Sequence, residues 1–82
     1  MRVAVDISLY PLDADFVPPI KDVVRRLEAR AELQVESNRM STQIRGDYDV
    51  VMRALEKEIK TTFERVPKAV FAIKILNNPL AT

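Results

Sequence analysis

The side chains best suited to binding a ligand lie together near the middle of the sequence. Asn38, Ser41, Thr42 and Gln43 carry only amide and hydroxyl groups. Such groups both donate and accept hydrogen bonds, so they suit a neutral heterocycle whose edge offers donors and acceptors side by side. The alternative is that these side chains satisfy a turn or pair with one another across neighbouring strands.

Two further candidates lie near the start of the chain. Tyr10 could stack on a ring and donate a hydrogen bond from its hydroxyl, with Ser8 beside it. Because Tyr10 directly precedes Pro11, packing at the end of a strand is the alternative role. The predicted ligand-binding residues are Ser8, Tyr10, Asn38, Ser41 and Thr42.

The charged residues give a second set of candidates. Asp6, Glu36 or Asp47 could balance a cationic ligand, although capping of a helix explains Asp47 more simply. Arg39 and Arg45 could hold a phosphate group, and the alternative is that both are solvated surface charges.

Missing residue types limit the chemistry of the chain. The 82 residues include no Cys and no His, so thiolates, disulfides and the commonest general base and metal ligand are absent. The acidic residues do not follow a calcium-loop pattern, and one glycine cannot build a phosphate-binding loop. We therefore expect no enzyme activity, no metal and no other cofactor.

Charge and hydropathy exclude other classes of partner. Thirteen basic and twelve acidic residues give a net charge of +1, which is too small to attract nucleic acid or an anionic membrane. The first ten residues lack the features of a signal peptide, and no apolar run approaches the roughly 20 residues that span a bilayer. These patterns predict a cytoplasmic protein, and the length predicts one domain over residues 1–82.

Four regions have the periodicity of β-strands, in which side chains alternate between two faces. Apolar residues fall at every second position between Val3 and Leu9. Two shorter alternating segments flank Asn38-Arg39, where asparagine tolerates the left-handed conformation of a tight turn. The predicted strands are Val3–Leu9, Leu33–Ser37, Met40–Ile44 and Ala69–Leu76.

Two regions have the periodicity of helices. Asp15 with the Pro18-Pro19 pair predicts the start of the first, while Asp47 and Pro67 bound the second. Arg26 and Arg30, on the charged side of the first helix, are expected to face water. The apolar stripes expected to be buried are Phe16, Ile20, Val23, Val24, Leu27 and Ala31, then Tyr48, Val51, Met52, Leu55, Ile59 and Phe63.

The order β-α-β-β-α-β predicts an α+β, ferredoxin-like sandwich, an antiparallel sheet with two helices on one face. The helices are expected to cover the alternating residues of 3–9 together with Phe71, Ile73 and Ile75. The open face would carry Ala4, Tyr10, Val70, Ala72 and Leu76 among Asp6, Ser8 and Lys74. A face of this apolarity predicts a homo-oligomer in which another subunit covers it, and a half-polar face in contact with solvent is the alternative.

Several segments in order resemble the YkoF-like thiamine-binding family. They are ISLYPL, FVPPIKDVVRRLEA, VESNRMSTQIRGDYDVVMRALEKEI and KAVFAIKILN, including Tyr10-Pro11, Pro19-Ile20, Met40-Ser41-Thr42 and Gly46-Asp47-Tyr48. The resemblance implies a ferredoxin-like fold, dimers or tetramers, and binding of thiamine or its hydroxymethylpyrimidine moiety.

Two other functions remain as alternatives. The first is a structural or regulatory oligomerisation module without a small-molecule ligand. The second, a ferredoxin-like RNA-binding domain, would display aromatic residues on the open strands and a basic surface. Here the outward positions are mostly aliphatic or small and the charge is balanced, so nucleic acid is not the expected partner.

Overall fold

The N-terminal strand β1 (Arg2–Pro11) is a central strand, and the rest of the fold is arranged around it. A computed structural model describes residues 1–79, so the last three residues of the predicted domain range 1–82 lie outside the described part. Along β1, Val3, Val5, Ile7 and Leu9 are buried. The alternating pattern therefore identified the buried face of this strand correctly.

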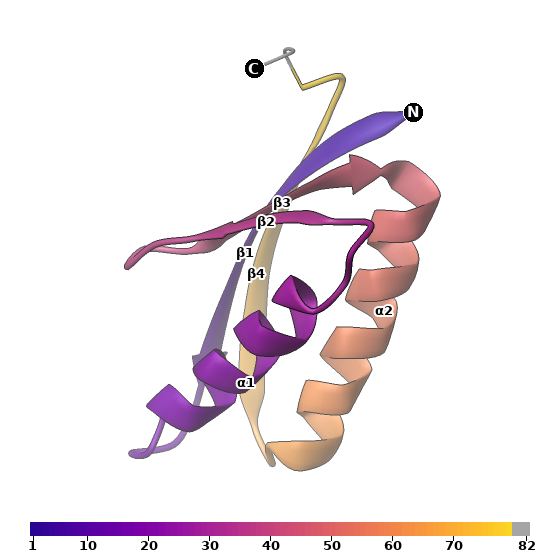
Figure 1. Ribbon diagram of the computed structural model, residues 1–82. Helices are drawn as coiled ribbons and strands as arrows, with labels where there is room; N and C mark the ends of the chain where they lie inside the picture. Colours follow the sequence, from indigo (N-terminus) through magenta and orange to yellow (C-terminus); the bar gives the residue numbers. More distant parts are fainter. Residues whose placement is uncertain (80–82) are drawn as a thin grey trace.

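Five more elements complete the chain, and both helices lie on the same side of the sheet (Figure 1). The sheet is antiparallel with strand order β2-β3-β1-β4. The remaining elements are α1 (Val17–Glu28), β2 (Gln34–Ser37), β3 (Thr42–Asp47), α2 (Tyr48–Arg65) and β4 (Ala69–Asn77). This is the predicted α+β, ferredoxin-like sandwich, and the prediction of fold class is confirmed.

The ends of several elements differ from the prediction. Strand β3 runs over Thr42–Asp47 where Met40–Ile44 was expected, so Met40 lies in the turn. Strand β1 continues through Pro11, which pairs with Ala69 of β4. Helix α1 starts at Val17, with no side-chain cap, and the half-exposed Phe16 occupies the N-cap position. It also ends at Glu28, so Ala31 lies beyond the helix and is exposed.

The core lies between the helices and the inner face of the sheet. Its most deeply buried side chains include Leu27 of α1, Ile44 of β3 and Val51 of α2. A Cβ at Gly46 of β3 would lie 3.0 Å from Val51 Cγ2, so glycine permits the close approach of α2 to the sheet. Ile75, expected to be covered, is 47% exposed because β4 is an edge strand.

Arg26 and Arg30 do not simply face water, as the periodicity predicted. Both reach from α1 to Glu58 of α2, with Arg30 Nη2 2.8 Å from Glu58 Oε2 and Arg26 Nε 3.1 Å from Glu58 Oε1. Arg26 also donates to the buried Thr62 hydroxyl at 2.7 Å. The Glu58 side chain is only 9% exposed, so one buried carboxylate holds the two helices together.

We predict that Glu58→Ala lowers the free energy of unfolding by about 2 kcal/mol, because Arg30 loses its carboxylate partner and Arg26 keeps only Asp22 and Thr62. The estimate is below the value for a fully buried pair because both arginines retain some contact with water. Urea denaturation measures the change. Glu56→Ala, an exposed glutamate on the same helix, should alter stability by less than about 0.5 kcal/mol. Equal stability of the two variants would contradict this role for Glu58.

Candidate functional site

The pairing of β1 with β3 stops before β1 ends. The β1–β3 register runs from Arg2–Asp47 only as far as Ile7–Thr42. The β1–β4 register continues to Pro11–Ala69. Residues 8–11 of β1 therefore have a neighbouring strand on one side alone, and the β2–β3 hairpin turn leaves a gap on the other.

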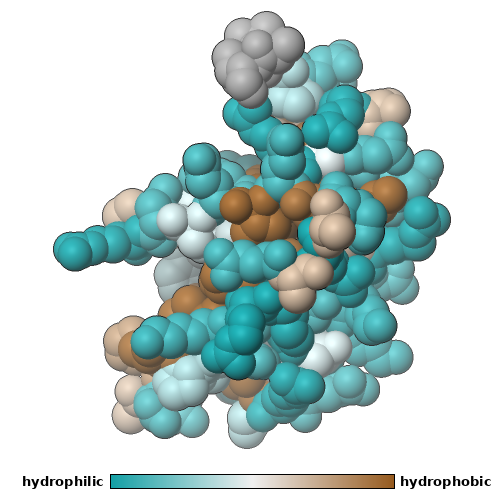
Figure 2. All heavy atoms as spheres, viewed as in Figure 1, coloured by the Kyte–Doolittle hydropathy of each residue, from teal (hydrophilic) through white to brown (hydrophobic). Residues whose placement is uncertain are grey.

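A pocket occupies this end of the sheet, between β1, α1 and the hairpin. Its volume is about 500 Å³, within the roughly 300–1,000 Å³ typical of small-molecule sites. In the same view as Figure 1, Figure 2 shows apolar surface in brown along the side of α1 that faces the hairpin. All five predicted binding residues line the pocket, namely Ser8, Tyr10, Asn38, Ser41 and Thr42.

The apolar walls of the pocket were not predicted as a binding surface. They include Leu12 and Phe16 from the connection between β1 and α1, Ile20 and Val24 of α1, and Phe71 of β4. The sequence placed some of these in buried stripes, where periodicity cannot separate a packed residue from one lining a cavity.

The predicted residues approach the pocket from both faces of the sheet. Thr42 points to the helix side, where its hydroxyl lies 2.6 Å from that of Ser37. Ser41 points to the open side and donates to Asp6 Oδ1 at 2.5 Å. The Ser8 hydroxyl donates to the Met40 carbonyl at 3.4 Å. Each hydroxyl has one donor and two acceptor sites, so these contacts leave acceptor capacity for a ligand.

Asn38 has a structural role in the turn. Its Oδ1 accepts hydrogen bonds from the Met40 N–H at 2.8 Å and the Ser41 N–H at 3.1 Å. The backbone N–H of Asn38 donates to the Ser41 carbonyl at 3.0 Å. The alternative interpretation, in which a side chain of this stretch satisfies a turn, is therefore correct for this amide oxygen.

The charged candidates are divided between the pocket and other surfaces. Among the described residues that line the pocket, Arg39 is the charged one. Asp6, Glu36 and Arg45 project from the open face of the sheet. Asp47 precedes α2 as expected, but its side chain makes no cap hydrogen bond and lies 3.4 Å from the Met1 amine.

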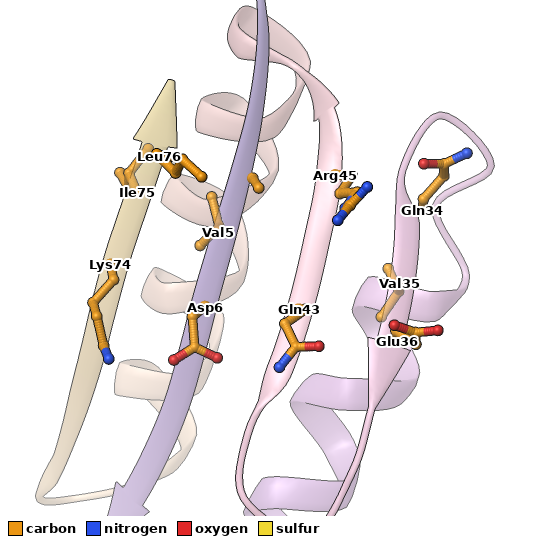
Figure 3. A pocket seen from close by; sticks show the side chains of 11 residues that line it. Val5, Asp6, Gln34, Val35, Glu36, Gln43, Arg45, Lys74, Ile75 and Leu76 are labelled. Atoms are coloured by element: carbon orange, nitrogen blue, oxygen red, sulfur yellow. The ribbon is translucent and has the colours of Figure 1, made fainter. Parts of the chain in front are cut away.

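The open face carries a larger and shallower depression of about 880 Å³. Lys74, Asp6, Gln43 and Glu36 cross it in one row from four strands (Figure 3). These side chains are charged or polar and follow a sheet surface. The pocket at the end of the sheet has apolar walls from several elements, and we therefore regard it as the better site for a small ligand.

Within residues 1–79, no three His, Cys, Asp or Glu side chains group as a metal site would require. In the same part of the chain, neither helix has the length and apolarity to cross a membrane.

Fold and pocket together define the class of protein: a ferredoxin-like α+β domain with an apolar pocket at the end of its sheet, edged by hydroxyl groups. The model of the YKOF-related family matches residues 2–79, and the chain belongs to that family. Comparison with curated proteins returns no match.

Solved structures share the fold of this chain. A hypothetical protein from Methanocaldococcus jannascii is 26% identical with a TM-score of 0.81, the match covering 95% of this chain and 81% of the other. A Streptococcus pneumoniae protein is 20% identical, with coverages of 98% and 90% and a TM-score of 0.88. A Thermotoga maritima protein, named as a candidate thiamine biosynthesis/salvage protein, is 16% identical, with coverages of 92% and 82% and a TM-score of 0.83.

We predict that Asn38→Ala lowers the free energy of unfolding by about 1–2 kcal/mol, because two turn N–H groups lose their acceptor. Thermal denaturation followed by circular dichroism measures the loss. Asn38→Asp is the matched control, because its carboxylate retains the acceptor oxygen and should stay close to the parent. The role assigned to the amide oxygen is wrong if Ala and Asp destabilise the protein equally.

Proposed function

We propose that this protein binds thiamine or its hydroxymethylpyrimidine moiety in the pocket at the end of the sheet and releases it unchanged. We further propose that it acts in the cytoplasm as a homo-oligomer assembled through the open sheet face. The ligand-binding residues of this proposal are Ser8, Tyr10, Asn38, Ser41 and Thr42.

The observation that carries the proposal is that these five residues border one apolar pocket. They come from β1 and from the hairpin, which are separated by about thirty residues of sequence. An aminopyrimidine has apolar ring faces and an edge of alternating acceptors and donors. Apolar walls such as Phe16 and Phe71 suit the ring faces, and the hydroxyls suit the edge.

The family and the pocket chemistry support the same ligand class. A relative in the same fold is named as a candidate thiamine biosynthesis/salvage protein. In the part of the pocket that the structure describes, no carboxylate faces the ligand. The neutral pyrimidine therefore suits the interior better than the cationic thiazolium ring of thiamine, which would lie toward the solvent.

Calorimetric titration with thiamine and hydroxymethylpyrimidine tests the proposal. We expect Ser41→Ala or Thr42→Ala to weaken binding by about five- to a hundredfold, as each removes a hydrogen bond worth about 1–3 kcal/mol in a partly desolvated pocket. Circular dichroism checks that each variant is folded.

Thr61→Ala is the matched control, because the Thr61 hydroxyl donates to Lys57 O on α2 and Thr61 does not line the pocket. It should bind as the parent does. Absence of binding to the parent at millimolar ligand would sink the proposal and favour an oligomerisation module without a ligand. Unchanged affinity in both pocket variants would remove Ser41 and Thr42 from the site.

Assembly rests on a separate observation, the apolar residues on the open sheet face. Tyr10, Val70 and Leu76 are each about half exposed there, next to the smaller Ala72 and Ala4. The same face carries charges of both signs, with Lys74 beside Asp6 in the register. A second copy turned by a two-fold axis could cover the apolar residues and pair these charges.

We predict a dimer or tetramer for the parent by light scattering at micromolar concentration, and a smaller species for Leu76→Arg, which places a charge on the covered face. Tyr48→Arg is the control, since Tyr48 is also an exposed apolar residue but lies at the start of α2. A monomeric parent would rule out assembly through this face, as would a Leu76→Arg variant that keeps the parent's mass.

A further inference from the structure

The direction of the backbone along β1 can be read from two hydrogen bonds at its ends. Leu12 N–H donates to Lys68 O at 3.0 Å and continues the register between β1 and β4. Tyr48 N–H donates to Met1 O at 2.8 Å and continues the register between β1 and β3. In an antiparallel sheet, a residue directs its N–H and C=O to the same neighbour, and successive residues alternate.

Even-numbered residues of β1 therefore direct their backbone groups to β4, and odd-numbered residues direct theirs to β3. Leu9 is odd-numbered and follows the last pair between β1 and β3, Ile7–Thr42. A continued ladder would pair Leu9 with Met40. No backbone hydrogen bond joins these two residues in the structure.

The Met40 backbone groups form other hydrogen bonds in and beside the hairpin turn. Met40 N–H donates to Asn38 Oδ1 at 2.8 Å, and Met40 O accepts the Ser8 hydroxyl at 3.4 Å. The Leu9 backbone is thus left without its ladder partner, although only 7% of the residue is exposed. Leu9 and Met40 both line the pocket, and buried backbone polar groups are nearly always paired.

We propose that the main-chain N–H and C=O of Leu9 form the edge that recognises an aminopyrimidine ring. The N–H and C=O of one extended residue point the same way, as a donor and an acceptor side by side. A ring nitrogen next to an exocyclic amine presents the complementary pair. The ring nitrogen accepts from Leu9 N–H, and the amine donates to Leu9 C=O, which replaces the missing strand partner.

This inference rests on the proposed function. It adds that the pocket distinguishes a hydrogen-bond donor from an acceptor at each position of the ring edge. A hydroxyl rotates to donate or to accept, so serine and threonine alone would tolerate a ring with donor and acceptor exchanged. The backbone pair of Leu9 is fixed. The pocket should therefore reject the oxo analogue of hydroxymethylpyrimidine, in which an oxygen replaces the amine and the neighbouring ring nitrogen carries a proton.

Amide spectra of the full chain, labelled with nitrogen-15 and titrated with hydroxymethylpyrimidine, test the inference. We expect the Leu9 amide proton to move downfield and its hydrogen exchange to slow by about tenfold or more. The oxo analogue should bind at least about tenfold more weakly. Saturable binding that leaves the Leu9 amide unchanged would overturn the inference and leave the proposed function intact, whereas absence of any binding would overturn both.

A backbone ester provides the matching substitution, because an ester at Leu9 removes one N–H and keeps the side chain. We expect it to lower affinity about five- to a hundredfold. An ester at Val5 is the control, since Val5 N–H belongs to the ladder with Ile44 and Val5 does not line the pocket. The control should lose stability and retain affinity, and equal affinity of the two esters would contradict the role of Leu9.

Discussion

The end of the ladder between β1 and β3 at Ile7–Thr42 is the constraint on which the site depends. Beyond that pair the hairpin leaves β1, and the gap between them becomes a pocket rather than more sheet. Asn38 maintains the departure, since its side chain takes the Met40 N–H that a longer ladder would have used. One asparagine therefore shapes both the turn and the opening.

The side chains of β1 alternate between the two faces of the sheet without a break, so the two faces have different roles. The odd-numbered side chains of β1 form the core, and the even-numbered ones give the open face on which assembly is proposed. Near the pocket, Ser41 joins the two sides, since it lines the pocket and donates to Asp6 on the open face. A ligand that formed a hydrogen bond with the Ser41 hydroxyl would therefore alter the contact between Ser41 and Asp6 on the proposed assembly surface.

Much of the fold could be predicted because strand and helix periodicities differ, and this sequence follows each over long runs. The alternation from Val3 to Leu9 located the buried face of β1. The same reasoning failed for Arg26 and Arg30, because a periodicity assigns a side chain to a face of its own helix. Whether a second helix offers a buried carboxylate such as Glu58 depends on packing between elements.

The residues named from the sequence are polar and border one pocket, and their binding of a ligand stays a prediction. The hydrogen-bonding capacity of a hydroxyl or amide side chain is known from the residue type, so Ser8, Tyr10 and the hairpin residues could be named as candidates from the sequence. Walls such as Phe16 and Phe71 could not, since an apolar residue in the core and one beside a cavity have the same sequence pattern. Backbone groups such as those of Leu9 carry no sequence signal, because their availability follows from where a neighbouring strand stops.

The central claim is that a pyrimidine ring lies between α1 and the end of β1, on the helix side of the sheet. Nuclear Overhauser contacts between the methyl protons of bound hydroxymethylpyrimidine and the protein test this most directly. We expect contacts to Ile20, Val24 and Phe71, which line the pocket. Contacts instead to Ala72 and Leu76 of the open face would place the ligand on the wrong side of the sheet and contradict it.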